Sequence, residues 1–153
     1  MPDGVSFQAW SESMSVGIAL LDDDHEIIMC LTIRLQNCLE GQEDTASLTD
    51  ICERLIAYME FHQAREEKVM EACAYPDLEI HREDHTRCIH GVYAFMNRFA
   101  AQRDEVILRE FLSYLWEWFE QHVLAQDTGM RAFVTNNAQA HAVAEAFGRI
   151  DPR

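Results

Sequence analysis

The chain has 153 residues, about the size of one ordinary domain, and its many Ala, Leu, Glu, Met and Gln residues, with only six Gly and three Pro, favour an all-helical fold. Its formal charge of −15 disfavours nucleic acids and anionic membrane surfaces as partners, because these are bound mainly through Lys and Arg. It has neither a run of eighteen apolar residues nor a basic flank followed by an apolar run at the N-terminus, so we expect a cytoplasmic protein that does not span a membrane.

The first predicted helix follows an N-terminal arm. Residues 1–20 have mixed polarity, and Phe7 and Trp10 could cover one end of a helical bundle. A helical pattern begins at Asp22, because acidic residues suit a helix N-terminus and apolar residues then recur every three or four positions up to Gly41. The apolar positions of this helix are Leu21, Ile28, Leu31, Leu35 and Leu39.

Three more amphipathic helices are predicted after a polar link over residues 42–47. Apolar residues at helical spacing indicate a second helix that ends near Ala74, since Pro76 disfavours a helical residue before it. A third helix is expected over about residues 77–101 and a fourth over about residues 105–125. Four such helices with short links predict an up-down-up-down four-helix bundle.

The chain beyond the fourth helix is the hardest part to interpret. A stretch after Gly129 carries Phe133, Val134, Val143 and Phe147 and predicts a short fifth helix. We therefore divide the chain into a four-helix domain, residues 1–130, and a C-terminal extension, residues 131–153. An extension of this kind packs either on its own bundle or on another chain, so self-association or a protein partner is a further expectation.

Metal-competent residues fall on the apolar stripe of the predicted long helices, where an unpaired polar side chain is costly. His62 and Glu66 lie four residues apart on the second helix, so both point inward from adjacent turns. His81 and His85 repeat this spacing on the third helix. Two facing turns of ligands are therefore predicted inside the bundle.

The first and fourth helices complete the set. His25 lies one turn before Ile28, and His122 lies one turn beyond Phe119. Asp127 follows His122 by five residues, which is about 140° around a regular helix, so it reaches the same site only if the helix ends or distorts there. A single inward histidine is more often a hydrogen-bonded core residue, but an ensemble of this size is rarely buried without a function.

The number of ligands makes a further prediction. Imidazole and carboxylate suit iron, zinc and manganese, and five histidines with two carboxylates are too many for one ion. Two six-coordinate ions that share both carboxylates and one bridging oxide or hydroxide have a single position left. Dioxygen could bind there, within apolar walls that favour binding over chemistry. The candidate wall residues are Met29, Phe61, Leu115, Trp118, Phe119 and Val123.

These residues, in this order, resemble the ligand pattern of a known family. His25, His62-x3-Glu66, His81-x3-His85 and His122-x4-Asp127 are similar to the complete ligand set of the hemerythrins, especially their bacterial members. The resemblance covers residues 10 to 130 and also takes in Trp10, Val16-Gly17, Asp22, Glu66-Glu67, Met70 and Tyr75-Pro76. It implies a non-haem di-iron centre that binds dioxygen for transport, storage, delivery or sensing.

The resemblance also implies which residues serve which ion. His81, His85 and His122 would hold a saturated iron, His25 and His62 would hold the iron with the open position, and Glu66 and Asp127 would bridge the two. Three positions depart from the family pattern: Asp24 stands where Gln is usual, Gln63 where Phe is common, and Val123 where Ile is frequent. These departures bear on oxygen affinity and autoxidation rather than on metal binding.

Other polar residues have simpler interpretations. Cys30, Cys38, Cys52, Cys73 and Cys88 lack CxxC spacing, so buried reduced thiols are expected rather than a thiolate metal site. His90 and His141 lie outside the ligand pattern and are interpreted as surface or packing residues. Asp24 either accepts a hydrogen bond from a ligand histidine or simply suits the first turn of its helix.

Three other functions fit the same residues. A di-iron enzyme that activates dioxygen, peroxide or nitric oxide would use the same scaffold, although such sites typically carry more carboxylates. A signalling module would use the fifth helix to dock on a partner, with the metal site biasing that contact. Zinc or manganese without redox chemistry would also satisfy the ligands. Dioxygen binding without catalysis is the leading hypothesis.

Overall fold

A computed structural model describes residues 10–148 of the chain and contains helices and no strand in that range. The four long helices are α1 (Ala19–Leu39), α2 (Leu48–Ala72), α3 (Leu78–Ala101) and α4 (Glu105–Trp118). Two short helices follow, α5 (Arg131–Val134) and α6 (Ala138–Ala146). The boundaries of the first three long helices agree with the predicted ones to within a few residues, because the polar links and Pro76 mark their ends.

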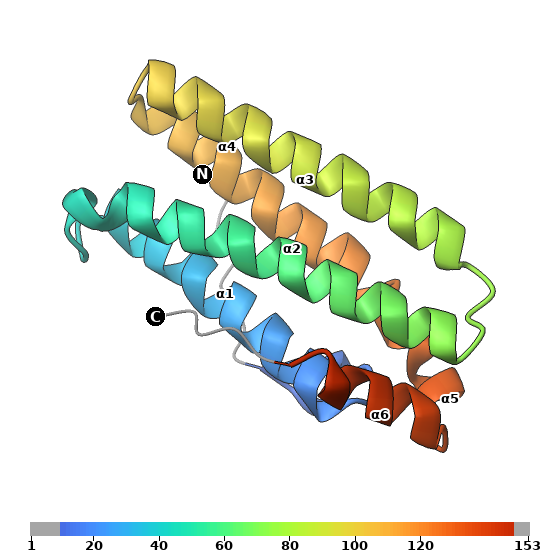
Figure 1. Ribbon diagram of the computed structural model, residues 1–153. Coiled ribbons are helices and arrows are strands. Elements are labelled where there is room, and N and C mark those ends of the chain that lie inside the picture. Colours follow the sequence, from blue (N-terminus) through green and yellow to red (C-terminus); the bar gives the residue numbers. More distant parts are fainter. Residues whose placement is uncertain (1–9, 149–153) are drawn as a thin grey trace.

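The long helices form an antiparallel bundle in which each packs against its two neighbours (Figure 1). Contacts join α1 to α2, α2 to α3, α3 to α4, and α4 back to α1. This closed ring with short links is the predicted up-down-up-down four-helix fold. Its polar centre lies between two buried apolar clusters, one around Leu35, Leu55 and Phe111, the other around Leu21, Met70 and Met130.

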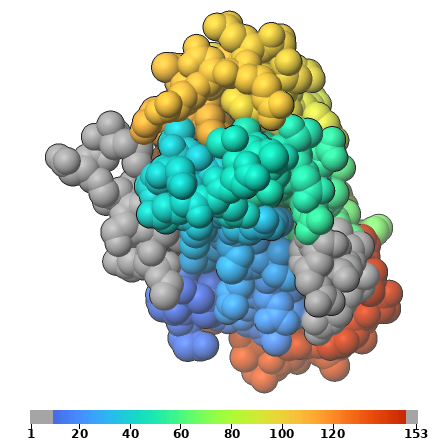
Figure 2. Space-filling model, turned by 90° about the vertical axis from the view of Figure 1, so that its left-hand side faces the viewer, coloured from blue at the N-terminus to red at the C-terminus, as the bar shows by residue number. Residues whose placement is uncertain are grey.

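The predicted short C-terminal helix is present as α6, and a four-residue helix, α5, precedes it. Contacts place α6 against α2 and α1. Ala140 and Ala144 are fully buried in the same apolar cluster as Val69 and Met70, so α6 covers the outer side of the bundle. In Figure 2, the orange-to-red C-terminal residues lie below α1, on the side away from the yellow α3.

The N-terminal arm is described from Trp10 onward, so the predicted position of Phe7 lies outside the described residues. Trp10 is half-buried and packs against the apolar cluster of Met29, Phe119 and Val123. Arg131 holds the arm from the other end of the chain, since its guanidinium Nε donates to the Ser15 carbonyl at 2.9 Å. Within residues 10–148, no helix is both long and apolar enough to cross a bilayer.

Candidate metal centre

Seven predicted ligand residues meet at one place inside the bundle. Each is at most 3% exposed, and they come from α1, α2, α3 and the segment that follows α4. The residues are His25, His62, Glu66, His81, His85, His122 and Asp127. Carboxylates and imidazoles concentrated in a dry interior need either protons or a metal to balance them.

The side chains divide into two groups, each able to surround one ion. In the first, ligand atoms of His81, His85, His122, Glu66 and Asp127 lie within 4.8 Å of one another. In the second, ligand atoms of His25 and His62 lie equally close to those of the same two carboxylates. Glu66 and Asp127 therefore belong to both groups, the arrangement that a pair of carboxylate-bridged ions requires.

A change of helix type brings Asp127 into the site. The regular α4 ends at Trp118, and residues Phe119–Leu124 form a π-helical segment that contains His122. A 3-10 turn, Asp127–Met130, follows. The α-helical part of the fourth helix thus ends earlier than predicted. The distortion that brings Asp127 into the site is a π turn, a feature often found at functional sites.

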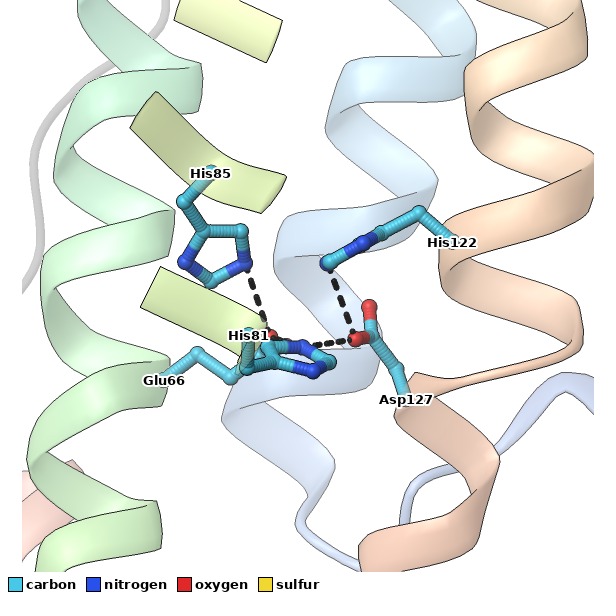
Figure 3. Close-up of side chains that lie close together, drawn as sticks. All are labelled: Glu66, His81, His85, His122 and Asp127. Atoms are coloured by element: carbon cyan, nitrogen blue, oxygen red, sulfur yellow. Dashed lines mark hydrogen bonds and ion pairs between the residues drawn. The ribbon is translucent and has the colours of Figure 1, made fainter. Parts of the chain in front are cut away.

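The contacts among these residues converge on the two carboxylates (Figure 3). His81 lies between them, with its Nε2 2.9 Å from Oε1 of Glu66 and 2.5 Å from Oδ1 of Asp127. His85 Nε2 is 3.2 Å from Glu66 Oε1, and His122 Nε2 is 3.2 Å from Asp127 Oδ1. On the other side, His25 Nε2 is 3.3 Å from Asp127 Oδ2.

Unpaired polar atoms at the centre fit a metal. Among the described residues, no hydrogen-bond partner is present for Nε2 of His25, His62, His85 and His122, or for Glu66 Oε2 and Asp127 Oδ2. Native interiors rarely leave buried polar atoms unsatisfied, and a cation accepts electron pairs from such nitrogens and oxygens together. The donor set, nitrogen and oxygen without sulfur, suits iron, manganese or zinc.

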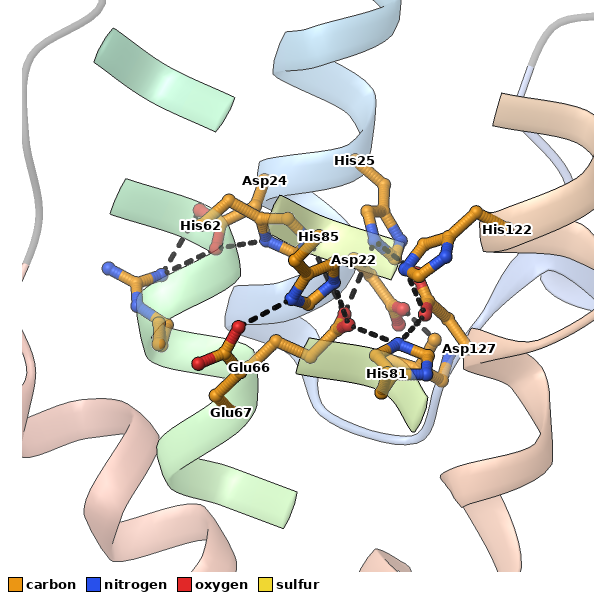
Figure 4. Close-up of polar contacts among 12 residues, drawn as sticks. Asp22, Asp24, His25, His62, Glu66, Glu67, His81, His85, His122 and Asp127 are labelled. Atoms are coloured by element: carbon orange, nitrogen blue, oxygen red, sulfur yellow. Dashed lines mark hydrogen bonds and ion pairs between the residues drawn. The ribbon is translucent and has the colours of Figure 1, made fainter. Parts of the chain in front are cut away.

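Hydrogen bonds behind the ligands fix two of the imidazoles (Figure 4). His62 Nδ1 lies 3.0 Å from Asp24 Oδ2, and His85 Nδ1 lies 2.8 Å from Glu67 Oε1. An acceptor at Nδ1 places the proton on that nitrogen and leaves the Nε2 lone pair for a metal. Of the two interpretations of Asp24, the structure supports the contact with a histidine of the predicted ligand set, His62.

Sequence reasoning missed Arg65, which is 1% exposed and donates from Nη1 to both oxygens of Asp24 at 3.1 and 3.0 Å. It also missed the Tyr58 hydroxyl, which donates to Asp24 Oδ1 at 2.7 Å. A signal was present, because Arg65 is in helical phase with Tyr58, His62 and Val69 on the inward stripe of α2. A charged residue at such a position needs a buried partner.

The predicted wall residues occupy different places. Met29, Phe119 and Val123 form one buried cluster with Trp118 packed beside it, and Leu115 lies in the adjoining apolar cluster. The Phe119 ring lies 6.2 Å from that of His25, and the Trp118 ring stacks on His122 at 4.8 Å.

Phe61 lies elsewhere, because its ring contacts Phe147 at 5.3 Å and the Arg65 guanidinium at 4.6 Å. These contacts face the C-terminal extension, so we leave Phe61 out of the proposed pocket.

The cysteines take no part in either ligand group. All five are free thiols; Cys38, Cys52 and Cys88 are buried, whereas Cys30 is exposed and Cys73 is half-buried. The expectation of reduced thiols therefore fits, but burial applies to three of them. Burial raises the pKa of Cys52 and of Cys88 to about 12, which keeps both thiols protonated and unreactive.

Charges at the metal-free centre shift the pKa values of its groups. Burial by itself lowers the pKa of His25 and His81, but the nearby carboxylates of Asp127 and Glu66 outweigh it and raise the pKa to about 9 and about 10, respectively. Burial by itself raises the pKa of Glu66 and Asp127, but the surrounding imidazoles outweigh it, so both carboxyls titrate below their usual range. Without a metal, protonated histidines therefore balance the charge of the two carboxylates.

We expect the melting temperature of the metal-free protein to fall as the pH rises from about 6.5 to 10. A histidine with a raised pKa stabilises the fold fully below its unfolded pKa of 6.5, and this contribution is lost as the pH passes its folded pKa. The carboxylates contribute stability above about pH 4.5 that is lost on acidification. Thermal unfolding in excess chelator measures this, and a melting temperature that rises between pH 6.5 and 9 would contradict it.

Comparison with known proteins gives a consistent result. Residues 16–134 match the family described as "Hemerythrin HHE cation binding domain". A bacteriohemerythrin from Ralstonia nicotianae is 30% identical over 125 residues, which cover 82% of this chain and 87% of that protein. Bacteriohemerythrins from Pseudomonas aeruginosa and Stenotrophomonas maltophilia are 28% and 25% identical, covering 78% and 92% of this chain and 76% and 92% of those proteins.

Proposed function

The chain belongs to the hemerythrin family, and from that premise we propose that it binds dioxygen reversibly at a non-haem di-iron centre. The observation that carries this proposal is the sharing of Glu66 and Asp127 by two groups of ligands, one with three histidines and one with two. Unequal groups leave the two-histidine side with fewer protein ligands. That side, formed by His25 and His62, is the proposed place for dioxygen.

The iron pair would supply the electrons on which dioxygen binding depends, together with one open coordination position. The protein residues would hold the ions at a fixed separation, through Glu66 and Asp127, and would exclude water. Met29, Phe119 and Val123 support this role, because they are at most 5% exposed and form one apolar cluster beside His25. Apolar walls offer no proton donor, which favours release of dioxygen over its reduction.

An enzyme that activates dioxygen, peroxide or nitric oxide is the second candidate. A surface pocket of about 410 Å³ on the α3–α4 side is lined in part by Cys88, Tyr114, Trp118 and His122, so one proposed ligand lies on its wall. His122 belongs to the three-histidine group, so a substrate in this pocket would meet the side with more protein ligands. This favours dioxygen binding over catalysis. Rapid consumption of dioxygen in the presence of a reductant would instead favour the enzyme.

The test is metal content together with the visible spectrum of the purified protein. We expect two irons per chain, and an absorption band that forms when the anaerobically reduced protein meets air and disappears when dioxygen is removed. Turnover without such a band would support the enzyme instead. Two zinc or manganese ions, or a single iron, would contradict the proposal.

Replacing His122 with alanine is expected to reduce the metal content of the three-histidine group. The substitution removes one nitrogen ligand, and Asp127 loses its contact with His122 Nε2 at 3.2 Å. Metal analysis after dialysis against a weak chelator measures the loss. His90→Ala, an exposed position on α3, is the control. Retention of two irons with an unchanged spectrum would refute the role of His122.

Other expectations remain proposals beside this one. They are the division into a four-helix domain, residues 1–130, and an extension, residues 131–153, and a cytoplasmic location. A signalling role through the extension would require a partner protein that binds residues 131–153, and shortening the chain after Thr135 would abolish that binding. The buried cluster that joins Ala140 and Ala144 to Val69 indicates that the extension packs on this bundle.

A further inference from the structure

Arg65 is a buried cation with three kinds of partner. Among the described residues it is the largest side chain that is fully buried, and it lies on α2 beside the proposed ligands His62 and Glu66. Its Nη1 donates to both oxygens of Asp24, its Nη2 donates to the carbonyl of Gly148, and its guanidinium lies over the Phe61 ring. A charge buried this deeply requires such partners, and removing one leaves the others unpaired.

Asp24 contacts both Arg65 and the proposed metal ligand His62. Its Oδ2 is 3.0 Å from His62 Nδ1, and its Oδ1 accepts from the Tyr58 hydroxyl at 2.7 Å. The carboxylate is held from three sides and cannot turn away from His62 without breaking the contacts with Arg65. His62 Nε2 then faces the centre, 3.3 Å from Glu66 Oε2.

The far end of this chain of contacts is the C-terminal extension. Gly148 lies two residues beyond the last residue of α6 and has a φ of +85°, a conformation that residues with a side chain rarely adopt. The segment is held in place by Phe147, whose ring lies 5.3 Å from that of Phe61, and by the buried Ala144. The Gly148 carbonyl is thus the outermost member of a relay that runs through Arg65 and Asp24 to His62.

We propose that Arg65 and Asp24 are positioning residues through which the docked C-terminal extension fixes the orientation and donor strength of His62. A carboxylate acceptor on one ring nitrogen makes the other a better metal donor, and this carboxylate is anchored by the extension. The inference rests on the proposed function, because His62 belongs to the two-histidine side. It assigns the extension a part in the metal centre beyond covering the bundle.

Substitution of Gly148 tests the relay in the full-length protein, with Gly41 as the matched control. Both glycines have a positive φ, +85° and +76°, and in both cases an added Cβ meets nothing within 4 Å. Valine at either position strains the backbone in the same way. Gly148→Val moves the carbonyl that Arg65 binds, whereas Gly41→Val strains the end of α1 at the link to α2.

The first measurement needs no metal: the exchange rate of the His62 Nδ1 proton in metal-free protein, observed by nitrogen-15 NMR. We expect Gly148→Val to speed this exchange at least tenfold and Gly41→Val to leave it unchanged. The second measurement is iron retention against a chelator. Here Gly148→Val and Asp24→Asn are expected to lower the affinity of one of the two ions by about 10- to 100-fold, the usual effect of losing a partner behind a ligand.

Equal proton exchange and equal iron retention in the Gly148→Val and Gly41→Val variants would overturn the relay and leave Arg65 a structural anchor. Failure of the proposed function looks different. In that case the unsubstituted protein shows no oxygen-dependent band, while the His62 proton still responds to Gly148→Val.

Discussion

Glu66→Gln is expected to empty both metal positions. Glu66 contacts four histidines: its Oε1 lies 2.9 Å from His81 Nε2 and 3.2 Å from His85 Nε2, and its Oε2 lies 3.3 Å from His62 Nε2 and 3.7 Å from His25 Nε2. Glutamine keeps the size of the side chain but replaces the carboxylate that we propose to bridge the two ions with a neutral amide. Loss of a carboxylate shared by both ions would weaken the binding of each. We therefore expect each affinity to fall by more than the roughly 100-fold that follows the loss of a residue hydrogen-bonded to a metal ligand.

Metal titration of the metal-free variant measures this effect, and its folding is checked by circular dichroism. The control is Glu71→Gln, five residues later on α2, where the exposed carboxylate contacts Lys68 at 3.2 Å and belongs to neither ligand group. Two ions bound to the Glu66→Gln variant with unchanged affinity would show that the carboxylate is not shared.

Arg65→Met is expected to lower the free energy of unfolding of the metal-free protein by about 3–5 kcal/mol, the usual cost of removing one partner from a buried ion pair. The substitution leaves the buried Asp24 carboxylate without its cation, although Tyr58 and His62 still donate to it. Methionine has a similar length and retains contact with Phe61. The loss is therefore mainly electrostatic rather than a cavity effect.

Urea unfolding measures this loss, and a second substitution separates the ion pair from general packing. Arg98→Met, which removes an exposed pair with Glu110 at 3.0 Å, should cost less than about 1 kcal/mol. The double variant Asp24→Leu with Arg65→Met should be more stable than the two single losses together predict, by about 0.5–3 kcal/mol. Additive losses would mean that Asp24 and Arg65 are not coupled.

The inward position of the proposed ligand residues was predictable because helical periodicity is a local property. His62 with Glu66 and His81 with His85 share a helix face whatever the partner helices are, and each pair lies among apolar residues that must point inward. The same argument placed His25 and His122. Burial of all of these side chains follows from the amphipathic pattern, since a polar residue on an apolar stripe is carried into the core with its neighbours.

Asp127 was only conditionally predictable. Its five-residue separation from His122 required the helix to end or to distort, and an ordinary helix end was one of these two options. The structure instead has a π turn over Phe119–Leu124. A π turn adds a residue to the helical repeat, and whether it forms depends on the packing of Phe119 and Val123 against Met29, which no local pattern specifies.

The sequence by itself determined the all-helical class, the long helices, the inward face of each and the types of ligand, because these depend on periodicity, turn residues and donor chemistry. The tertiary structure decided how the carboxylates are shared, which way Phe61 faces and what Arg65 binds. These depend on distances between segments far apart in the chain, such as Asp24, Arg65 and Gly148, and such distances are set only when the helices pack.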